Sequence, residues 1–514
     1  MEIIPPRAKP IGYLWLVNNY KLNVIPHFRW SYIIESGARR VLKDPTNLSM
    51  PEIYLYDINY ALENPDDPMQ NLVFALKHEG LNLEIISAFF NCITNDNPSN
   101  KIVQKFVEEQ RTGKYQRMVW YLYEKLSGSN LEIPDLKQGS YVDLLDEEEY
   151  YTAKSIQHRR YRINDNLLGS IYCCSFVRKT DLLKSIEHKK LDVLARDIVK
   201  SYDQKIINRA SSYLYAKETM SSYQIEREVP SKQRLARFIQ LIKKVEEVPN
   251  LTNEILIKLQ NSLVEDRFIN NSYRITQNYV GQKRDWYDQL IHYISPKPED
   301  VNGLMADLLA ELQRMLESGV HPIVIATIIS FGFVFIHPFD DGNGRLHRFL
   351  IHYILYRTGF VPVGTMFPIS ATILSDMQRY NEILEQFSKP LMSLLLDYDV
   401  NDDGVLTVKQ ETVQFYKYID YTVQAEYLAL CIEKTIHTDF KKELLYLTNY
   451  DKTKKELSQI VDMPDQQLDL FIRVSIQNNG TLSQSKRTTH FKMLTDDEIK
   501  MLEAVIQKNM LDKI

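Results

Sequence analysis

The sequence predicts a mainly α-helical protein with a buried apolar helix at its centre, and three observations support this fold class. Apolar residues recur at three- and four-residue spacing along most of the chain, which is the period of a helix with one buried face. Glycine is scarce, at 17 of 514 residues, and this disfavours a fold with many tight hairpins. Residues 322–336 are almost entirely apolar and lead into a dense polar segment, residues 337–348. A buried helix that leads into a dense polar segment is typical of a binding or catalytic site.

The composition limits the classes of function. Hydrophobic residues make up 44% of the chain, which is ample for a sizeable core, and a net charge of −5 gives no global electrostatic case for nucleic-acid binding. The cysteines at positions 92, 173, 174 and 431 match neither a metal-ligand spacing nor a disulfide scaffold. We therefore expect reduced thiols and a cytoplasmic location. We also expect no signal peptide and no membrane span, because the longest apolar run is short and interrupted.

Changes in pattern divide the chain into five predicted segments. They are a helical N-terminal domain (1–130), an irregular connector (131–205), a helical core (206–390), a segment of turns, short strands and a helix (391–434), and a helical C-terminal domain (435–514). The connector carries a basic cluster at 158–162. This cluster is either a solvated face or an ion-pair partner for the acidic residues 146–149.

Within the core, three stretches have a distinct pattern. Residues 206–228 predict a helix that Pro230 ends, and residues 302–316 predict another helix. Residues 273–281 partly alternate between polar and apolar side chains, which predicts a short extended hairpin. After the core, residues 399–410 partly match a calcium-binding loop. Gln410 stands where that loop needs a glutamate, so a turn followed by a short strand is the better interpretation.

The C-terminal domain has clear helix boundaries. We expect one helix to begin near residues 463–465 and end at 478–480, and residues 495–498 form a capping box for the last helix. Lys486 and Arg487 lie between the two, in an arrangement with a weak likeness to a winged helix. A plain helical tail explains the same pattern equally well.

The polar segment begins the next predicted helix with Gly342, Asn343 and Gly344. A glycine-bracketed turn at a helix N-terminus directs several backbone N–H groups the same way, and the positive end of the helix dipole adds to them. Glycine also allows the backbone to approach phosphate oxygens closely. The turn therefore predicts an anion site.

Arg345 and Arg348 are three residues apart and share one face of this helix. Cations near a helix N-terminus are disfavoured by ~0.3–1 kcal/mol each, so their placement favours a bound polyanion such as a triphosphate. The alternative is that both arginines pair with nearby carboxylates, but that would leave the glycines unexplained.

Asp341 and His337 complete the predicted chemistry. A carboxylate beside a phosphate site is repelled unless a cation bridges the two, so Asp341 predicts a magnesium ion. An imidazole at the mouth of such a site is a natural general base for a hydroxyl nucleophile, and we assign this role to His337.

The whole segment resembles the signature of the Fic family, His-Pro-Phe-x-Asp/Glu-Gly-Asn-Gly-Arg-x-x-Arg, at every constrained position. The resemblance covers about 206–390 and implies a Fic-type helical core with a short β-hairpin flap. Most Fic proteins transfer AMP from ATP to a Ser, Thr or Tyr hydroxyl of a target protein and release pyrophosphate. The kinase-like branch of the family has Lys where this chain has Gly344, which argues against phosphorylation.

The resemblance also implies individual roles. His337 is similar to the family's base and Asp341 to its Mg²⁺ ligand, while Gly342, Asn343 and Gly344 resemble the phosphate loop. By the same likeness Arg345 holds the α- and β-phosphates and Arg348 the γ-phosphate, and Phe339 anchors the loop in the core. The residues in the flap position, which would hold the target segment by main-chain pairing, are Tyr273, Arg274, Ile275, Tyr279, Val280 and Gly281.

Residues 222–227 resemble the inhibitory helix of the family's self-inhibited members, which precedes the core in one class. Ser222 and Glu226 match that motif, and its glutamate pairs with the second arginine of the signature, here Arg348. Arg227 departs from the pattern, because Gly or Asn is usual there. An ordinary solvated helix face is the simpler interpretation of the same residues, and Glu218 and Glu228 are competing carboxylates.

The leading hypothesis is thus a self-inhibited protein adenylyltransferase that uses ATP and Mg²⁺ and acts on a protein substrate, with self-modification and a homo-oligomer both allowed. The resemblance also allows the reverse reaction, in which Glu226 orients water to remove AMP. A third hypothesis is a nucleotide-sensing regulatory or DNA-binding protein that acts through the C-terminal helices.

Overall fold

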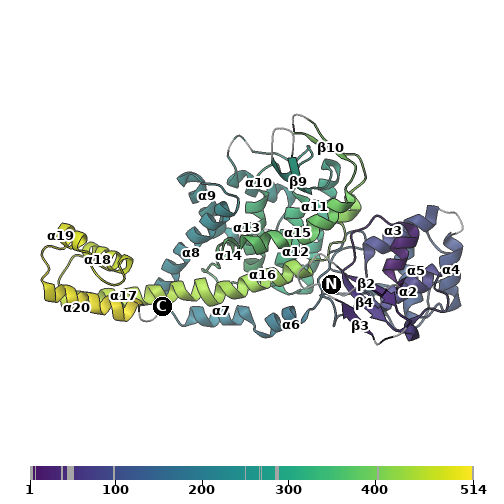
Figure 1. Ribbon diagram of the computed structural model, residues 1–514, viewed down its shortest axis with the longest axis horizontal. Coiled ribbons are helices and arrows are strands. Elements are labelled where there is room, and N and C mark those ends of the chain that lie inside the picture. The colour runs from purple at the N-terminus through teal and green to yellow at the C-terminus, as the bar shows by residue number, and fades with distance from the viewer. Residues whose placement is uncertain are drawn as a thin grey trace. The chain divides into compact units, whose positions relative to one another are not determined.

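The computed structural model describes the chain except for residues 1–3, 6, 36, 38, 43–50, 96–98, 249, 266, 268, 284–288, 402–403 and 512–514. Its internal contacts divide it into two compact units. The first contains residues 1–185, 232–358 and 376–429, and the second contains 186–231, 359–375 and 430–514. Figure 1 labels the helices and strands. The predicted fold class, mainly α-helical with small sheets, is confirmed.

The first unit begins with a four-stranded sheet that the sequence analysis did not predict. Its strands, in the order β1-β2-β4-β3, are β1 (Lys9–Ile11), β2 (Arg29–Ile33), β4 (Glu52–Tyr56) and β3 (Arg40–Leu42). Strands β2 and β4 are parallel, and the other two pairs are antiparallel. The two central strands are rich in aromatic and β-branched residues but only five residues long. A run that short shows its two-residue period poorly, which is why it was missed.

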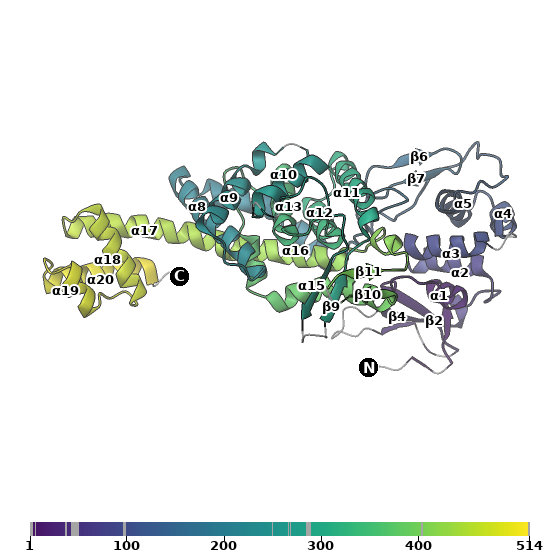
Figure 2. The same ribbon diagram turned by 90° about the horizontal axis from the view of Figure 1, so that it is seen from above.

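Helices pack beside this sheet in the N-terminal part of the unit (Figure 2). They are α1 (Tyr13–Tyr20), α2 (Pro68–His78), α3 (Leu83–Asn95), α4 (Ser99–Glu109) and α5 (Lys114–Ser127), with a 3₁₀ turn at Ile58–Tyr60. Residues 71–78 in α2 and 115–126 in α5 carry apolar side chains at the three- and four-residue spacing of a helix with one buried face. Asp67 caps α2 by accepting from the backbone N–H groups of Met69 and Gln70, which satisfies donors that the helix itself leaves unbonded.

Residues 131–180, the first part of the segment predicted as an irregular connector (131–205), contribute to the core of the first unit. Three short strands, β5 (Val142–Asp143), β7 (Ile163–Asp165) and β6 (Ile156–His158), form a sheet in that order, and the segment's apolar side chains enter the same core as α1–α5. The loops that connect these strands are irregular, so the apolar residues show no regular spacing in the sequence. Ile163 and Leu167 are nevertheless completely buried. Helices α6 (Asp181–His188) and α7 (Leu191–Lys200) follow.

The basic cluster at 158–162 pairs with carboxylates other than residues 146–149. Arg160 lies 2.8 Å from a carboxylate oxygen of Glu124 and 2.6 Å from one of Asp135. Glu124 also accepts hydrogen bonds from the Trp120 indole N–H and the Tyr161 hydroxyl. Burial alone would raise the pKa of Glu124, but these hydrogen bonds outweigh it and hold the pKa below the ordinary value of 4.5.

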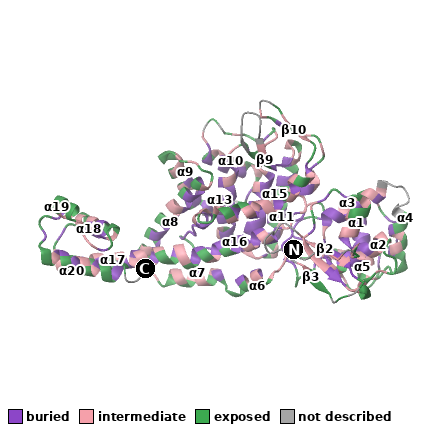
Figure 3. Ribbon diagram, in the orientation of Figure 1, coloured by how far each residue is buried: buried purple, intermediate pink, exposed green. Residues whose placement is uncertain are grey.

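The helical core of the first unit surrounds α12, in which every residue except Pro322 and Val334 is buried. Figure 3 shows buried residues, in purple, in the helices of this core. Its helices are α9 (Lys232–Lys243), α10 (Asn253–Leu263), α11 (Pro298–Ser318), α12 (Pro322–Ile336), α13 (Asn343–Arg357), α15 (Met377–Leu394) and α16 (Thr422–Thr435), with a 3₁₀ turn at Val245–Glu247. Helix α12 packs against α11 and α13. A Cβ atom at Gly332 would lie 2.9 Å from the Leu308 side chain, so this glycine lets α11 and α12 approach closely.

Two hairpins border the core. Strand β8 (Tyr279–Lys283) pairs with β9 (Gln289–Ile294), and strand β10 (Tyr398–Val400) pairs with β11 (Leu406–Val408). A 3₁₀ turn at Val413–Tyr416 leads into α16. One ligand position of the calcium-loop candidate, Asp403, lies outside the described residues.

The second unit contains α8 (Gln204–Ile225), the short α14 (Ile369–Leu374) and the C-terminal helices. Those helices are α17 (Lys441–Ile460), α18 (Asp465–Gln477), α19 (Gln484–His490) and α20 (Asp496–Ile506), with π-helical turns at Ile436–Phe440 and Gln507–Leu511. Helices α17, α18 and α20 share one apolar core, and the predicted capping box between Thr495 and Glu498 is present. The described residues 441–511 contain no strand, so the strand pair that a wing requires is not among them.

Glu218 fastens α8 to α14 within the second unit. Its carboxylate accepts hydrogen bonds from both the backbone N–H and the hydroxyl of Ser370, and the Glu218 side chain is buried. Among the described residues of both units, no helix is long and apolar enough to cross a membrane.

Substituting Arg160 by methionine should lower the free energy of unfolding by about 3 kcal/mol, because it leaves the buried Glu124 carboxylate without its cation. The folded-state pKa of Glu124 lies below its unfolded value, so its contribution is present above pH ~4.5 and is lost as the pH falls through the folded-state pKa. The variant should therefore lose less stability on acidification than the parent. Urea unfolding at several pH values measures both effects.

The neighbouring Arg159, which is exposed, is the matched control. Arg159→Met should change stability by less than about 0.5 kcal/mol. Equal losses in the two variants would contradict the structural role of the Glu124 network.

Candidate active site

The turn between α12 and α13 contains two residues in the left-handed backbone region. His337 ends α12 with φ 52°, and Gly342 precedes α13 with φ 89°. Glycine adopts this conformation without cost, whereas histidine in it is uncommon and strained by about 1–2 kcal/mol. The backbone of His337 therefore has to be held by its surroundings.

Asn343 closes the turn with a pair of hydrogen bonds. Its carbonyl oxygen accepts from the Phe339 N–H at 3.1 Å, and its amide donates to the Phe339 carbonyl at 2.7 Å. Phe339 is fully buried, with its ring centroid 5.4 Å from that of Tyr273 and 6.2 Å from that of Phe333. The turn is thus fixed by one polar side chain and one aromatic side chain.

The His337 imidazole is oriented by a backbone carbonyl. Its Nδ1 lies 3.1 Å from the Val334 carbonyl oxygen. A carbonyl only accepts hydrogen bonds, so Nδ1 must carry the proton and the neutral ring has its lone pair on Nε2. This tautomer is the one that a general base acting through Nε2 requires.

Helix α13 begins at Asn343, as predicted, with Gly342 as its N-cap. The Asp341 carboxylate accepts from the Gly342 N–H at 2.6 Å and from the Arg345 guanidinium at 2.7 Å, both through Oδ1. Arg345 also donates to the Leu263 carbonyl at 2.9 Å. One of the two arginines therefore does pair with a carboxylate, and the carboxylate is the predicted Mg²⁺ ligand itself.

The Asp341 side chain is 35% exposed, and its two named hydrogen bonds use only Oδ1. A carboxylate is the kind of oxygen ligand that a hard cation such as Mg²⁺ prefers, so Asp341 fits a cation that takes its other ligands from water and phosphate oxygens. Among the described residues, no group of three or more His, Cys, Asp or Glu side chains could hold a metal by itself. Arg348, on the same helix, is buried.

The predicted flap residues have different environments. Tyr273 and Arg274 are buried, while Ile275 is 85% exposed. Strand β8 begins only at Tyr279, and a register shift separates Val280 from Gly281 in its pairing with β9. The hairpin therefore starts later than the alternation in the sequence suggests.

Sequence analysis missed two side chains that contact the turn. Gln260 on α10 donates to the Asp341 carbonyl at 3.1 Å, and Asn278 donates to the carbonyls of His337 and Phe339 at 3.4 and 3.1 Å. Both are separated from the turn by about sixty residues or more. The sequence of a single chain contains no local signal for such contacts.

Comparison with known proteins agrees with this geometry. Residues 250–355 match the family model described as the Fic/DOC family. These residues form a Fic domain. The chain is 31% identical over 146 residues to "Protein adenylyltransferase Fic" of Nematostella vectensis, which is 28% of this chain and 33% of that protein. A protein of the same name from Culex quinquefasciatus is 36% identical over 91 residues, 18% of this chain and 16% of the relative. The chain thus covers a third or less of the length of these curated relatives.

Solved structures of Fic proteins also match. The crystal structure of a Fic family protein from Desulfovibrio desulfuricans G20 has a TM-score of 0.36 at 18% identity and covers 64% of this chain and 87% of its own. A Fic domain containing signaling protein from Bacteroides thetaiotaomicron has a TM-score of 0.35, also at 18% identity, with 51% and 98% covered.

The segment that resembles the inhibitory helix has a well-defined end in the second unit. Helix α8 stops at Ile225, Glu226 is its C-cap, and Arg227 follows with φ 57°. The Glu228 N–H donates to the Tyr223 carbonyl and the Arg227 N–H to the Gln224 carbonyl, both at 3.0 Å. This is a Schellman motif, in which the left-handed position favours Gly or Asn. The departure of Arg227 from the family pattern therefore falls on a residue with a left-handed backbone.

Replacing Arg227 by glycine should stabilise the end of α8 by about 1 kcal/mol, because glycine adopts the left-handed conformation without the steric cost of Cβ. Hydrogen exchange of the Arg227 and Glu228 amides should slow accordingly. The control is Gln224→Gly, which lies inside the helix and should lower stability by about 0.5–1 kcal/mol. Faster exchange in Arg227→Gly would contradict the motif.

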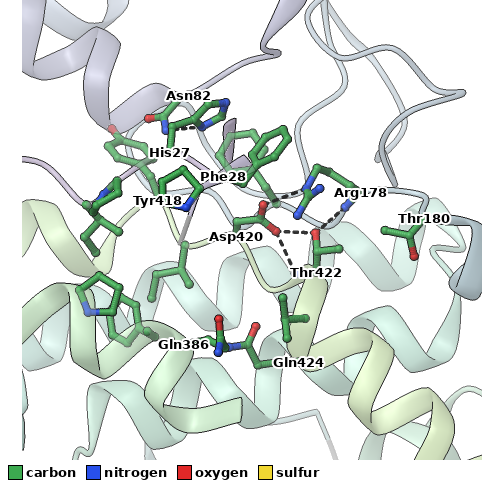
Figure 4. A pocket seen from close by; sticks show the side chains of 18 of the residues that line it. His27, Phe28, Asn82, Arg178, Thr180, Gln386, Tyr418, Asp420, Thr422 and Gln424 are labelled. Atoms are coloured by element: carbon green, nitrogen blue, oxygen red, sulfur yellow. Dashed lines mark hydrogen bonds and ion pairs between the residues drawn. The ribbon is translucent and has the colours of Figure 1, made fainter. Parts of the chain in front are cut away.

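A cavity of about 500 Å³ lies elsewhere in the first unit, and none of the motif residues lines it (Figure 4). The close-up shows His27 and Asn82 on one side and Gln386 and Gln424 on the other. Arg178 pairs with Asp420 at 3.1 Å between Nε and Oδ2. Burial lowers the pKa of His27 to about 4, so this imidazole is neutral at physiological pH. The cavity and the Fic motif therefore have no lining residue in common.

Proposed function

We propose that this chain is a protein adenylyltransferase, which transfers AMP from ATP to a Ser, Thr or Tyr hydroxyl of a target protein and releases pyrophosphate. The observation that carries the proposal is the orientation of His337, whose Nδ1–H is directed to the Val334 carbonyl and whose Nε2 has the lone pair. The printed name of the curated relatives, protein adenylyltransferase, supports the same reaction.

In this reaction Nε2 of His337 takes the proton from the target hydroxyl, whose oxygen then attacks the α-phosphorus. The bond between that phosphorus and the bridging oxygen breaks, and pyrophosphate leaves with its electron pair. The N–H groups at the start of α13 and the arginines at 345 and 348 offset the negative charge of the phosphates. Asp341 would hold the Mg²⁺ that neutralises charge on the leaving pyrophosphate.

Binding of phosphates would change the partner of Arg345. In the structure its guanidinium pairs with Asp341 at 2.7 Å. If Asp341 were to hold Mg²⁺, the Arg345 guanidinium would exchange this carboxylate for a phosphate group as its anion. We infer that this ion pair keeps the residues of the site in place before the nucleotide arrives.

We further propose that Glu226 inhibits the reaction by pairing with Arg348, as the family resemblance implies. A carboxylate on Arg348 would occupy the place of the γ-phosphate and misplace the α-phosphorus. The Schellman motif supports a defined position for Glu226 at the end of α8. The strain at Arg227 is expected to weaken this inhibition relative to a chain with glycine there.

Labelled ATP tests both parts of the proposal. Glu226→Gly should increase the transfer of label to the chain itself or to proteins of a lysate by at least tenfold, because Arg348 then binds only the nucleotide. His337→Asn in that background should abolish the label, and asparagine is chosen because it tolerates the left-handed backbone better than alanine.

The matched control is Glu228→Gly, which removes a carboxylate two residues further along and should leave labelling unchanged. No labelling in Glu226→Gly, or labelling that survives His337→Asn, would refute adenylyl transfer. Equal activation by Glu226→Gly and Glu228→Gly would refute the inhibitory role of Glu226 alone.

A further inference from the structure

Arg274 is a buried cation whose hydrogen-bond partners are backbone carbonyls. It is only 4% exposed. Its Nε donates to the His337 carbonyl at 2.8 Å, Nη1 to the Thr276 carbonyl at 2.9 Å, and Nη2 to the Pro296 carbonyl at 2.6 Å. A longer contact of 3.5 Å joins Nη2 to the Ile336 carbonyl. The planar fork of the guanidinium thus gathers carbonyls from three separate segments.

The carbonyls at the end of α12 explain why this charge is stable there. The last carbonyls of a helix lack partners within the helix, and together they form the negative end of its dipole. Ile336 and His337 lie at this end of α12. Burial lowers the pKa of Arg274 to about 10, so the guanidinium stays charged at neutral pH. No carboxylate of the described residues forms an ion pair with it. The carbonyl dipoles stabilise the charge, and the carboxylates of Asp340 and Glu299 add to this effect from a greater distance.

The same segment holds the backbone of the motif at three consecutive residues. The Arg274 side chain bonds the His337 carbonyl, its backbone N–H donates to the Pro338 carbonyl at 2.9 Å, and Asn278 donates to the Phe339 carbonyl at 3.1 Å. His337 is in the strained left-handed conformation, and such a residue persists only where its surroundings fix it. Arg274 and Asn278 supply that constraint on one side of the turn, and Asn343 supplies it on the other.

Arg274 also connects the motif to the base of the β8–β9 hairpin. Pro296, which accepts from Nη2, follows the end of β9, and the neighbouring Gln277 donates to the Ser295 carbonyl at 2.8 Å. The hydroxyl of Ser295 in turn donates to the Asn278 carbonyl at 2.9 Å. A shift of this hairpin base would therefore act on the same guanidinium that bonds His337.

We propose that Arg274 is a positioning residue for His337: it holds the end of α12 so that Nδ1–H stays on the Val334 carbonyl and Nε2 faces the reacting hydroxyl. That Nε2 faces a reacting hydroxyl rests on the proposed function. A side chain this buried is not available for contact with a target, so the positioning role belongs to the guanidinium and is distinct from the main-chain pairing expected of the flap.

Arg274→Lys tests the role, since lysine keeps the charge but loses the planar fork. The control is Arg117→Lys. Arg117 is also buried, at 6% exposed, and its Nη1 also donates to backbone carbonyls, those of Ser140 at 2.7 Å and Arg162 at 3.4 Å, far from the motif. Both variants should lose similar thermal stability, so a merely structural effect would appear equally in both.

The readout is the ¹⁵N spectrum of the histidine rings in the full chain, with His337 assigned from its loss in His337→Asn. The parent and Arg117→Lys should show Nδ1 protonated and Nε2 unprotonated at a pH where the ring is neutral. Arg274→Lys should show averaging between the two tautomers. In the Glu226→Gly background, Arg274→Lys should also lower kcat for AMP transfer by roughly ten- to a hundredfold, with KM for ATP changed less than about twofold.

An unchanged His337 tautomer in Arg274→Lys would overturn the proposal whatever the activity of the chain. So would an equal fall of kcat in Arg117→Lys. A shifted tautomer in a chain that transfers no AMP would leave the positioning role standing and refute the proposed function instead.

Discussion

Two helix ends of opposite polarity meet within a few residues, and the structure of the Fic motif depends on how each end is neutralised. The negative end of α12 meets a buried guanidinium, and the positive end of α13 meets a glycine turn beside Asp341. The two arrangements could not be exchanged, because a helix dipole favours positive charge at its C-terminal end and negative charge at its N-terminal end. Because α12 is buried almost throughout, its carbonyls have little access to water, and a protein donor must satisfy them. This constraint places a cation at Arg274 and makes the start of α13 suitable for phosphate.

This view also explains how a strained histidine is retained. Hydrogen bonds hold the turn around His337 from both sides, and together they offset the cost of its left-handed conformation. The same hydrogen bonds also fix the rest of the turn. Asn343 packs the loop against Phe339, and Arg274 caps the helix. A histidine in a regular helix would lack the turn that directs Nδ1 back to the Val334 carbonyl. The distortion is therefore what brings the His337 ring to that carbonyl.

The sequence predicted those parts that depend on neighbours in the chain. The bounds of α12, the start of α13 and the capping box at Thr495 all follow from local pattern, and they agree with the structure. The N-terminal sheet and the burial of residues 131–180 were missed, since their short strands gain stability from distant segments. For the same reason the side-chain contacts of Arg274 were not predicted. They are made to carbonyls that lie 22 and 63 residues away along the chain.

The burial of Arg274 has a consequence for the behaviour of the site in different solutions. Exposed charges further apart than about 8 Å are largely screened at physiological ionic strength, whereas buried charges and helix dipoles are screened much less. The guanidinium of Arg274 and the ends of two helices are buried sources of this kind close to His337 in the fold. Their contribution to the electrostatic environment of His337 is therefore intrinsic to the fold and is expected to vary little with the salt concentration.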